Sequence, residues 1–178
     1  MRWRVRTGYL VAIAALWFAH PTPASICLAA AVGIVGLLVR ASAAGHLHKQ
    51  EVLAVSGPYA YTRNPLYLGS AILALAAAAA MRSWVSTILL FAYFAIFYSA
   101  VMRREEWELH QRHGPSFEAY ASRVPLFFPR VTATPDAVAG TFSFAQYKKN
   151  REWRAALGFL LLLAILFARG TIRLPFGG

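Results

Sequence analysis

Residues 65–102 read PLYLGSAILALAAAAAMRSWVSTILLFAYFAIFYSAVM, with a single charged side chain at Arg82. Pro65 suits a first helical turn, where its missing N–H costs nothing. A helix needs about 17–25 apolar residues to cross a bilayer, so the run predicts two membrane helices, 65–81 and 84–102, joined by a tight reversal. The alanine run at 76–80 favours close packing between membrane helices, although helix propensity explains it equally well.

Three further apolar stretches, at residues 8–19, 24–39 and 153–168, lie outside this run. The first is short for a bilayer, and the proline-rich turn that follows it predicts a helical hairpin over residues 1–39. The chain is 58% apolar and 14% charged, against roughly 25% charged in a soluble domain. The sequence therefore predicts an all-α integral membrane protein with about five transmembrane helices.

The charged residues divide unevenly between the two sides that five spans would create. Residues 1–7, 40–64 and 103–154 share one side, which carries 15 of the 18 Lys and Arg and all seven acidic residues. Such an excess marks cytoplasmic loops, so we expect a multi-pass inner-membrane protein with its functional face in the cytoplasm. The net charge of +11 then belongs to a membrane-bordering surface. No zinc-finger or RNA-recognition signature supports nucleic-acid binding.

The segment SGPYAYTRNPLYLG, residues 56–69, leads into the third predicted helix. Arg63 and Asn64 stand just before the helix start at Pro65, where unpaired N–H groups and a partial positive charge favour a carboxylate or phosphate. The three tyrosines offer flat faces for stacking on an aromatic ring. An interfacial belt of Tyr and Arg is an equally good interpretation.

The segment RREEWEL, residues 103–109, continues the fourth predicted helix into the cytoplasm. Its carboxylates, Glu105 and Glu106, suit a ribose diol or a ligand ammonium group. The alternative is a solvated helix end with weak local ion pairs. Downstream, Gly114-Pro115 breaks the helix, and residues 117–129 predict an amphipathic helix followed by an extended strap on the membrane surface.

Together these segments resemble the isoprenylcysteine carboxyl methyltransferase family and its bacterial relatives, a superfamily that includes phospholipid N-methyltransferases. The first family signature is matched by Gly-Pro-Tyr at 57–59, Arg-Asn-Pro at 63–65 and Tyr-x-Gly at 67–69. The second is matched by Glu105-Glu106, Leu109, Gly114, Tyr120 and the Val-Pro…Pro of 124–129. The match covers about residues 40–129, half of the chain. Many family members have His in place of Asn64, and Asn cannot act as a base at neutral pH.

The resemblance implies S-adenosylmethionine as the methyl donor, held between the two segments beneath the strap, and a lipid-like acceptor from the bilayer. We expect one domain: the hairpin 1–39, a catalytic core 40–130, and a C-terminal segment 131–178 with the last span. The residues expected to line the donor pocket are Tyr59, Tyr61, Arg63, Asn64, Pro65, Tyr67, Leu68, Gly69, Glu105 and Glu106.

Two residues are assigned to the acceptor step. A carboxylate acceptor, as in an isoprenyl-cysteine-like molecule, needs only alignment and desolvation. A phospholipid amine needs a base, and Glu106 is the candidate. Arg40, at the end of the second predicted span, is the candidate to orient an acceptor carboxylate or phosphate, with a snorkelling charge as its alternative.

Other classes of site and function have less support. The pairs His46/His48 and His110/His113 lack a third ligand at motif spacing, so no metal site is predicted. An NADPH-dependent membrane reductase of related architecture would need more spans and a larger basic pocket. A non-catalytic membrane protein needs no cofactor, but a transporter usually carries intramembrane charges that these spans lack.

The charge division predicts that residue 135 lies in the cytoplasm and that the C-terminus lies outside. Reporter fusions at residue 135 and at the C-terminus measure this directly, and we expect a cytoplasmic signal only from the first. An external signal at residue 135 would contradict the topology and the position of the functional face.

Overall fold

The computed structural model of this chain describes residues 2–48, 52–134 and 140–171, and these residues form helices and connecting loops without strands. The helices are α1 (Arg2–Trp17), α2 (Pro23–His46), α3 (Pro65–Met81), α4 (Trp84–His113), α5 (Pro115–Ala121), α6 (Phe144–Lys149) and α7 (Trp153–Thr171), with a short 3-10 helix, η1 (Gly57–Ala60). The all-α class is confirmed. Four charged residues of the sequence argument, Lys49, Glu51, Asp136 and Arg173, lie outside the described residues.

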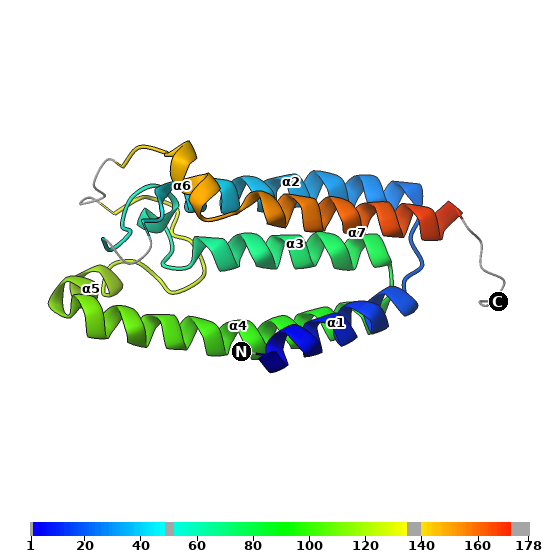
Figure 1. The fold of residues 1–178 in the computed structure, drawn as a ribbon, viewed down its shortest axis with the longest axis horizontal. Coiled ribbons are helices and arrows are strands. Elements are labelled where there is room, and N and C mark those ends of the chain that lie inside the picture. Colours follow the sequence, from blue (N-terminus) through cyan, green and yellow to red (C-terminus); the bar gives the residue numbers. More distant parts are fainter. Residues whose placement is uncertain (1, 49–51, 135–139, 172–178) are drawn as a thin grey trace.

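Three of these helices, α2, α4 and α7, are long and apolar enough to cross a membrane. The third predicted span is α3, a shorter apolar helix of 17 residues. Helix α1 has 16 residues and begins about midway along α4 (Figure 1). The chain is therefore a membrane protein by its helices, and the count of five spans stays a prediction.

Helices α2 and α3 approach each other closely along small residues. A Cβ on Gly69 would lie 2.8 Å from the carbonyl oxygen of Gly36, and one on Gly36 would lie 2.9 Å from that of Gly69. Farther along, the Ser25 hydroxyl donates to the carbonyl of Ala80 at 3.0 Å. Four of the five alanines at 76–80 are buried, so the packing interpretation of this run is confirmed.

Helix α2 runs seven residues past its predicted end at Val39. Ala43 and Ala44 are fully buried, and the Asn150 amide donates to the carbonyl oxygens of Ala44 and Leu47 at 2.9 and 3.0 Å. These bonds satisfy carbonyl groups that the helix end would otherwise leave unpaired. Tertiary contacts thus extend the helix beyond the predicted span into the polar stretch, as far as His46.

The predicted N-terminal hairpin is also wrong in its packing. Helix α1 packs mainly against α4, where the buried Ser86 hydroxyl donates to the carbonyl of Ala15 at 2.7 Å. Helix α2 turns away to pack against α3 and α7. Arg169 of α7 donates to the carbonyls of Trp17 and Ala19, which satisfies the C-terminal end of α1.

The polar segments gather at one end of the helices (Figure 1). Gly114, at φ 47°, ends α4 and turns the chain into α5, as the sequence predicts. Phe117 and Tyr120 of α5 then form a small core with Val124. The reversal at Arg82-Ser83 lies at the opposite end (Figure 1). This arrangement brings residues 56–69 and 103–130 together.

The contact between Gly36 and Gly69 predicts a large effect of a small substitution. Gly69→Ala places a methyl group against the backbone of α2, so we expect a loss of about 1–3 kcal/mol in stability. Gly158→Ala is the matched control, since its Cβ meets open space on α7. Helix propensity should then stabilise that variant by roughly 0.5–1 kcal/mol. Thermal unfolding in detergent measures both, and equal effects would contradict the close approach.

Candidate functional site

Two polar contacts join the start of α3 to the end of α4. The Arg63 guanidinium (Nη1) lies 2.6 Å from Glu106 Oε1, and the Tyr67 hydroxyl donates to Glu105 at 2.6 Å. Both side chains of the Arg63–Glu106 pair are partly buried, with 16% and 27% exposed. The structure therefore brings together the cores of the two sequence segments.

Glu106 has a carboxyl whose pKa is shifted by its surroundings. Desolvation raises the pKa of its carboxyl above the ordinary 4.5, and the nearby Arg63 charge offsets this only in part. The contact between Arg63 Nη1 and Glu106 Oε1 is close but lacks hydrogen-bond geometry. Glu106 Oε1 and Arg63 Nε are both buried, and neither atom has a hydrogen-bond partner among the described residues. Buried polar atoms left in this way are unusual and indicate where a bound group would donate or accept.

A strap, residues 124–130, covers the start of α3 through backbone groups. The Arg63 N–H donates to the carbonyl of Pro125 at 2.9 Å, and the Asn64 amide donates to that of Leu126 at 3.0 Å. The buried Thr62 hydroxyl donates to the carbonyl of Phe127 at 2.9 Å. The predicted strap is therefore present, and Asn64 holds the strap in place.

Tyr59 and Tyr120 anchor the base of the site. The Tyr120 hydroxyl donates to the carbonyl of Tyr59 at 2.8 Å, and both residues are buried. Burial raises the pKa of both phenols, so they stay neutral, and the charges of Glu105 and Glu152 add to this effect at Tyr59. Tyr59 is thus within electrostatic reach of both α4 and α7, but it is packed inside the protein and offers no open face for stacking.

An aromatic wall, formed by Tyr67, Phe94, Tyr98 and Phe127, borders the site on its apolar side. The Tyr67 ring meets the Tyr98 ring edge-on at 5.4 Å, and Phe94 stacks on Tyr98 at 4.2 Å. Phe127 of the strap meets Phe94 at 6.4 Å. Tyr67 is therefore held by its hydroxyl and by its ring, and the strap touches the membrane part of α4.

The remaining predicted pocket residues lie around this centre with structural contacts. Pro65 is fully buried at the helix start, and Gly69 faces α2. Tyr61 is 38% exposed, and its carbonyl accepts from the Arg130 N–H at 3.0 Å. Leu68 is half-buried. The structure thus gathers Arg63, Tyr67, Glu105 and Glu106 into one polar cluster and leaves the others as its frame.

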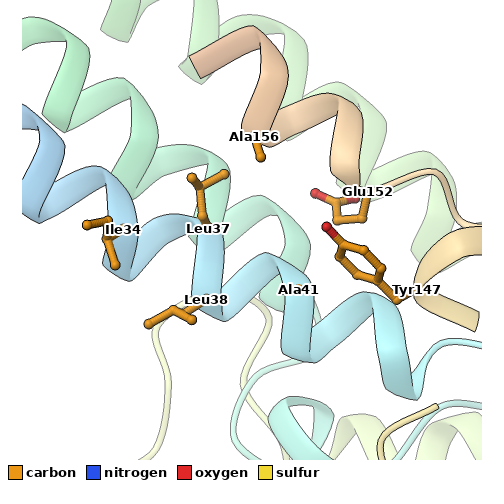
Figure 2. Close-up of a pocket in the computed structure, with 7 residues that line it drawn as sticks. All are labelled: Ile34, Leu37, Leu38, Ala41, Tyr147, Glu152 and Ala156. Carbon is orange, nitrogen blue, oxygen red and sulfur yellow. The ribbon is translucent and has the colours of Figure 1, made fainter. Parts of the chain in front are cut away.

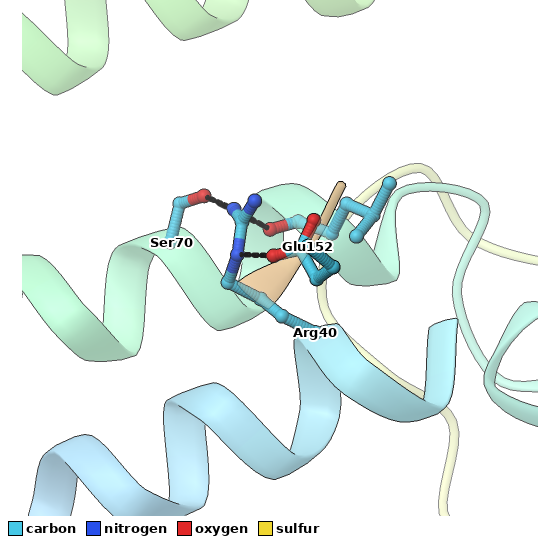
Figure 3. Close-up of polar contacts among 4 residues, drawn as sticks. Arg40, Ser70 and Glu152 are labelled. Carbon is cyan, nitrogen blue, oxygen red and sulfur yellow. Dashed lines mark hydrogen bonds and ion pairs between the residues drawn. The ribbon is translucent and has the colours of Figure 1, made fainter. Parts of the chain in front are cut away.

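Arg40 lies on the other side of α3, within α2 (Figure 3). Its guanidinium pairs with Glu152 and bonds the Ser70 hydroxyl and, at 3.1 Å, the carbonyl of Leu66. Its charge is therefore already balanced. Glu152 and Ser70 were missed by sequence reasoning. The signal for Glu152 was an acidic residue at the start of a membrane helix, where a charge requires a partner.

His46 and His110, one from each candidate pair, contact other groups. His110 lies 2.7 Å from Glu118 across the α4–α5 bend. His46 ring nitrogens lie 2.8 and 3.2 Å from the carbonyl oxygens of Ser42 and Gly140. Among the described residues no three metal-ligating side chains gather.

Comparison with known proteins finds one family model. Residues 41–116 match the phospholipid methyltransferase family, a range that contains the first motif and both glutamates of the second. The "Protein-S-isoprenylcysteine O-methyltransferase" of Schizosaccharomyces pombe is 34% identical over 84 residues, which are 47% of this chain and 36% of that protein.

Two bacterial relatives cover more of the chain. The "Nickel-cobalt-cadmium resistance protein NccN" of Alcaligenes xylosoxydans xylosoxydans is 33% identical over 73% of this chain and 64% of its own length. The "Cobalt-zinc-cadmium resistance protein CzcN" of Cupriavidus metallidurans is 34% identical over 57% of this chain and 47% of its own length. The chain thus spans less than two thirds of each of these relatives. No solved structure matches it.

The raised pKa of Glu106 predicts a pH-dependent difference between the natural protein and Glu106→Gln. A carboxyl whose pKa is raised by folding holds its proton more tightly in the folded state, so its contribution to stability falls as pH rises from 4.5 through the folded pKa. Glutamine does not titrate. We therefore expect the stability of the natural protein, relative to Glu106→Gln, to fall over this range and then level off. Unfolding in detergent at a series of pH values measures it, and a rising difference would contradict the desolvation of Glu106.

Proposed function

We propose that this chain, a member of the membrane methyltransferase superfamily that includes phospholipid and isoprenylcysteine carboxyl methyltransferases, transfers a methyl group from S-adenosylmethionine to a lipid-like acceptor. The acceptor is the carboxylate of an isoprenyl-cysteine-like molecule or the amine of a phospholipid. The reaction takes place at the cytoplasmic face of the inner membrane, with the bilayer and a lipophilic small molecule as partners.

The observation that carries the proposal is the Arg63–Glu106 pair, with Tyr67 and Glu105 beside it. S-adenosylmethionine has an amino-acid end with one positive and one negative charge, and a ribose with two hydroxyls. Arg63 offers a guanidinium for the carboxylate, and Glu106 offers a carboxylate for the ammonium group. Glu105 is exposed and placed to accept from ribose hydroxyls. The two buried atoms without hydrogen-bond partners, Arg63 Nε and Glu106 Oε1, fit this ligand.

An ion pair in the free protein suits a ligand that carries both charges. Breaking a partly buried pair normally leaves an uncompensated charge, which is costly. When the ligand supplies both opposite charges, each side chain exchanges one partner for another. The site therefore favours a zwitterionic group over a simple anion, since an anion would leave Glu106 unpaired.

The bound donor supplies an electrophilic sulfonium methyl group. The aromatic wall presents ring faces and edges near the site, and aromatic rings attract a nearby cation. The strap and the wall keep water away from the start of α3, which strengthens the interactions of Arg63 and Glu106. A carboxylate acceptor then needs only alignment by the surrounding residues.

An amine acceptor gives Glu106 a second task. A carboxyl whose pKa is raised is a stronger base than an ordinary carboxylate, so Glu106 suits the removal of an ammonium proton. We favour the donor-holding role because Glu106 is already paired with a cation, Arg63.

Loss of Arg63 or Tyr67 should weaken donor binding. Arg63→Ala removes charge-assisted bonds, which are worth roughly 1.5–3 kcal/mol, so we expect at least about a tenfold loss of affinity for S-adenosylhomocysteine. Tyr67→Ala removes the contact with Glu105 and part of the aromatic wall and should act in the same direction. Calorimetric titration of the detergent-purified protein measures both, with exposed Arg103→Ala as the matched control and NADPH as a second ligand. Unchanged affinity in both variants, or preference for NADPH, would contradict the proposed donor site.

Glu106→Gln separates the two roles of this carboxylate. If Glu106 holds the donor, both S-adenosylhomocysteine affinity and turnover should fall with every acceptor. If it acts as a base, donor affinity should survive while turnover of an amine falls by roughly 10²–10⁴-fold. A variant with normal affinity and normal turnover would leave Glu106 as a helix-end charge and contradict both roles.

A further inference from the structure

A groove between α2 and α7 lies apart from the Arg63–Glu106 site (Figure 2). Its volume is about 170 Å³, and its apolar lining consists of Ile34, Leu37, Leu38, Ala41 and Ala156. An apolar cavity of about 150 Å³ holds a benzene-sized molecule, so this groove has room for a short length of hydrocarbon chain. Ile34 and Leu38 are 56% and 64% exposed, so the groove opens onto the outer surface of two helices that can span a membrane.

The polar end of the groove is formed by Tyr147 and Glu152, whose side-chain oxygens point toward each other (Figure 2). Glu152 is only 10% exposed, and its carboxylate is paired with Arg40. The charge of Glu152 at this end of the groove is therefore balanced by Arg40, and a ligand would not have to neutralise it.

Four cationic residues lie next to Tyr147 and Glu152 in the sequence. Lys148, Lys149, Arg151 and Arg154 fall within seven residues of sequence, and all four are exposed. Within the described parts of the chain, Lys148, Arg151 and Arg154 make no ion pair. Glu152, the acidic residue of this stretch, is already bound to Arg40. A basic cluster beside a membrane helix attracts anionic lipid headgroups.

We propose that the groove binds one acyl chain of an anionic phospholipid, with the phosphate held by the basic residues 148–154. The apolar lining excludes a free anion from the groove, and the cationic rim selects among lipids. This lipid is distinct from the methyl acceptor, because the first turns of α3 separate the two places. Arg40 binds Leu66 and Ser70 on one side of α3, while Tyr67 reaches Glu105 on the other. The bound chain would hold α7 against α2.

The test is native mass spectrometry of the detergent-purified full chain with phosphatidylglycerol and phosphatidylcholine of equal chain length. We expect tighter retention of phosphatidylglycerol. Ala156→Leu fills the groove and should reduce that retention at least about tenfold. Gly158→Leu, which points into open space on the same helix, should leave it unchanged.

Charge variants test the rim separately. Lys148→Gln with Arg151→Gln should weaken phosphatidylglycerol binding about fivefold for each charge removed and leave phosphatidylcholine unaffected. Arg103→Gln with Arg112→Gln removes the same charge from α4 and is the matched control. Ala41→Leu fills the groove from α2 and replaces Ala156→Leu if that variant does not fold.

Three results would overturn the proposal. Equal retention of the two lipids would show that the rim does not select for charge. Full retention by a folded groove-filling variant would show that no chain enters the groove. Competition by glycerol phosphate at the affinity of the whole lipid would show a simple phosphate site.

Discussion

The partly buried charge of Arg40 is the constraint on which the arrangement of α2, α3 and α7 depends. A guanidinium within a helix that borders the membrane needs partners, and it finds them in Glu152, Ser70 and the carbonyl of Leu66. These partners belong to the start of α7 and the first turns of α3. Removing one partner of a buried pair typically costs about 3–5 kcal/mol, so this contact fixes how the three helices meet. The Arg40 side chain also lies directly over Gly69, beside the close approach of Gly36 and Gly69.

The candidate site is built on the opposite side of α3 and depends on that fixed position. Side chains bridge α3 to α4 there, through Arg63 to Glu106 and Tyr67 to Glu105. Helix α4 reaches the site by continuing past its apolar part as one helix of 30 residues. The site is thus a junction between a rigid helix start and a long projecting helix end, closed by the strap.

Much of this could be predicted from the sequence. The apolar runs predicted where the membrane helices lie, because an unbroken run of small and apolar residues has few alternatives to a membrane helix. The motifs carry the resemblance to the superfamily, and the phospholipid methyltransferase model matches residues 41–116, which contain the first motif and both glutamates. The motifs also contained the four residues of the polar cluster. The end of α2 and the packing of α1 were mispredicted, since both depend on tertiary contacts from Asn150 and Ser86. The pairing of Arg40 with Glu152 was not predicted, because Glu152 lies 112 residues away along the chain. Periodicity and spacing carry no information about such a distant pair.

The way the strap is held has an evolutionary consequence. The carbonyl groups of residues 125–127 accept the bonds that fix it, and every residue type has a carbonyl. The exposed side chains of the strap are less constrained than its backbone, and Phe128 is 79% exposed, whereas Val124 is buried and Phe127 packs on Phe94. Drift can therefore change the exposed side chains of the strap while Thr62, Arg63 and Asn64 stay as they are. If the proposed function holds, relatives of this chain can diverge in the lipids they accept through the exposed side chains of this short segment.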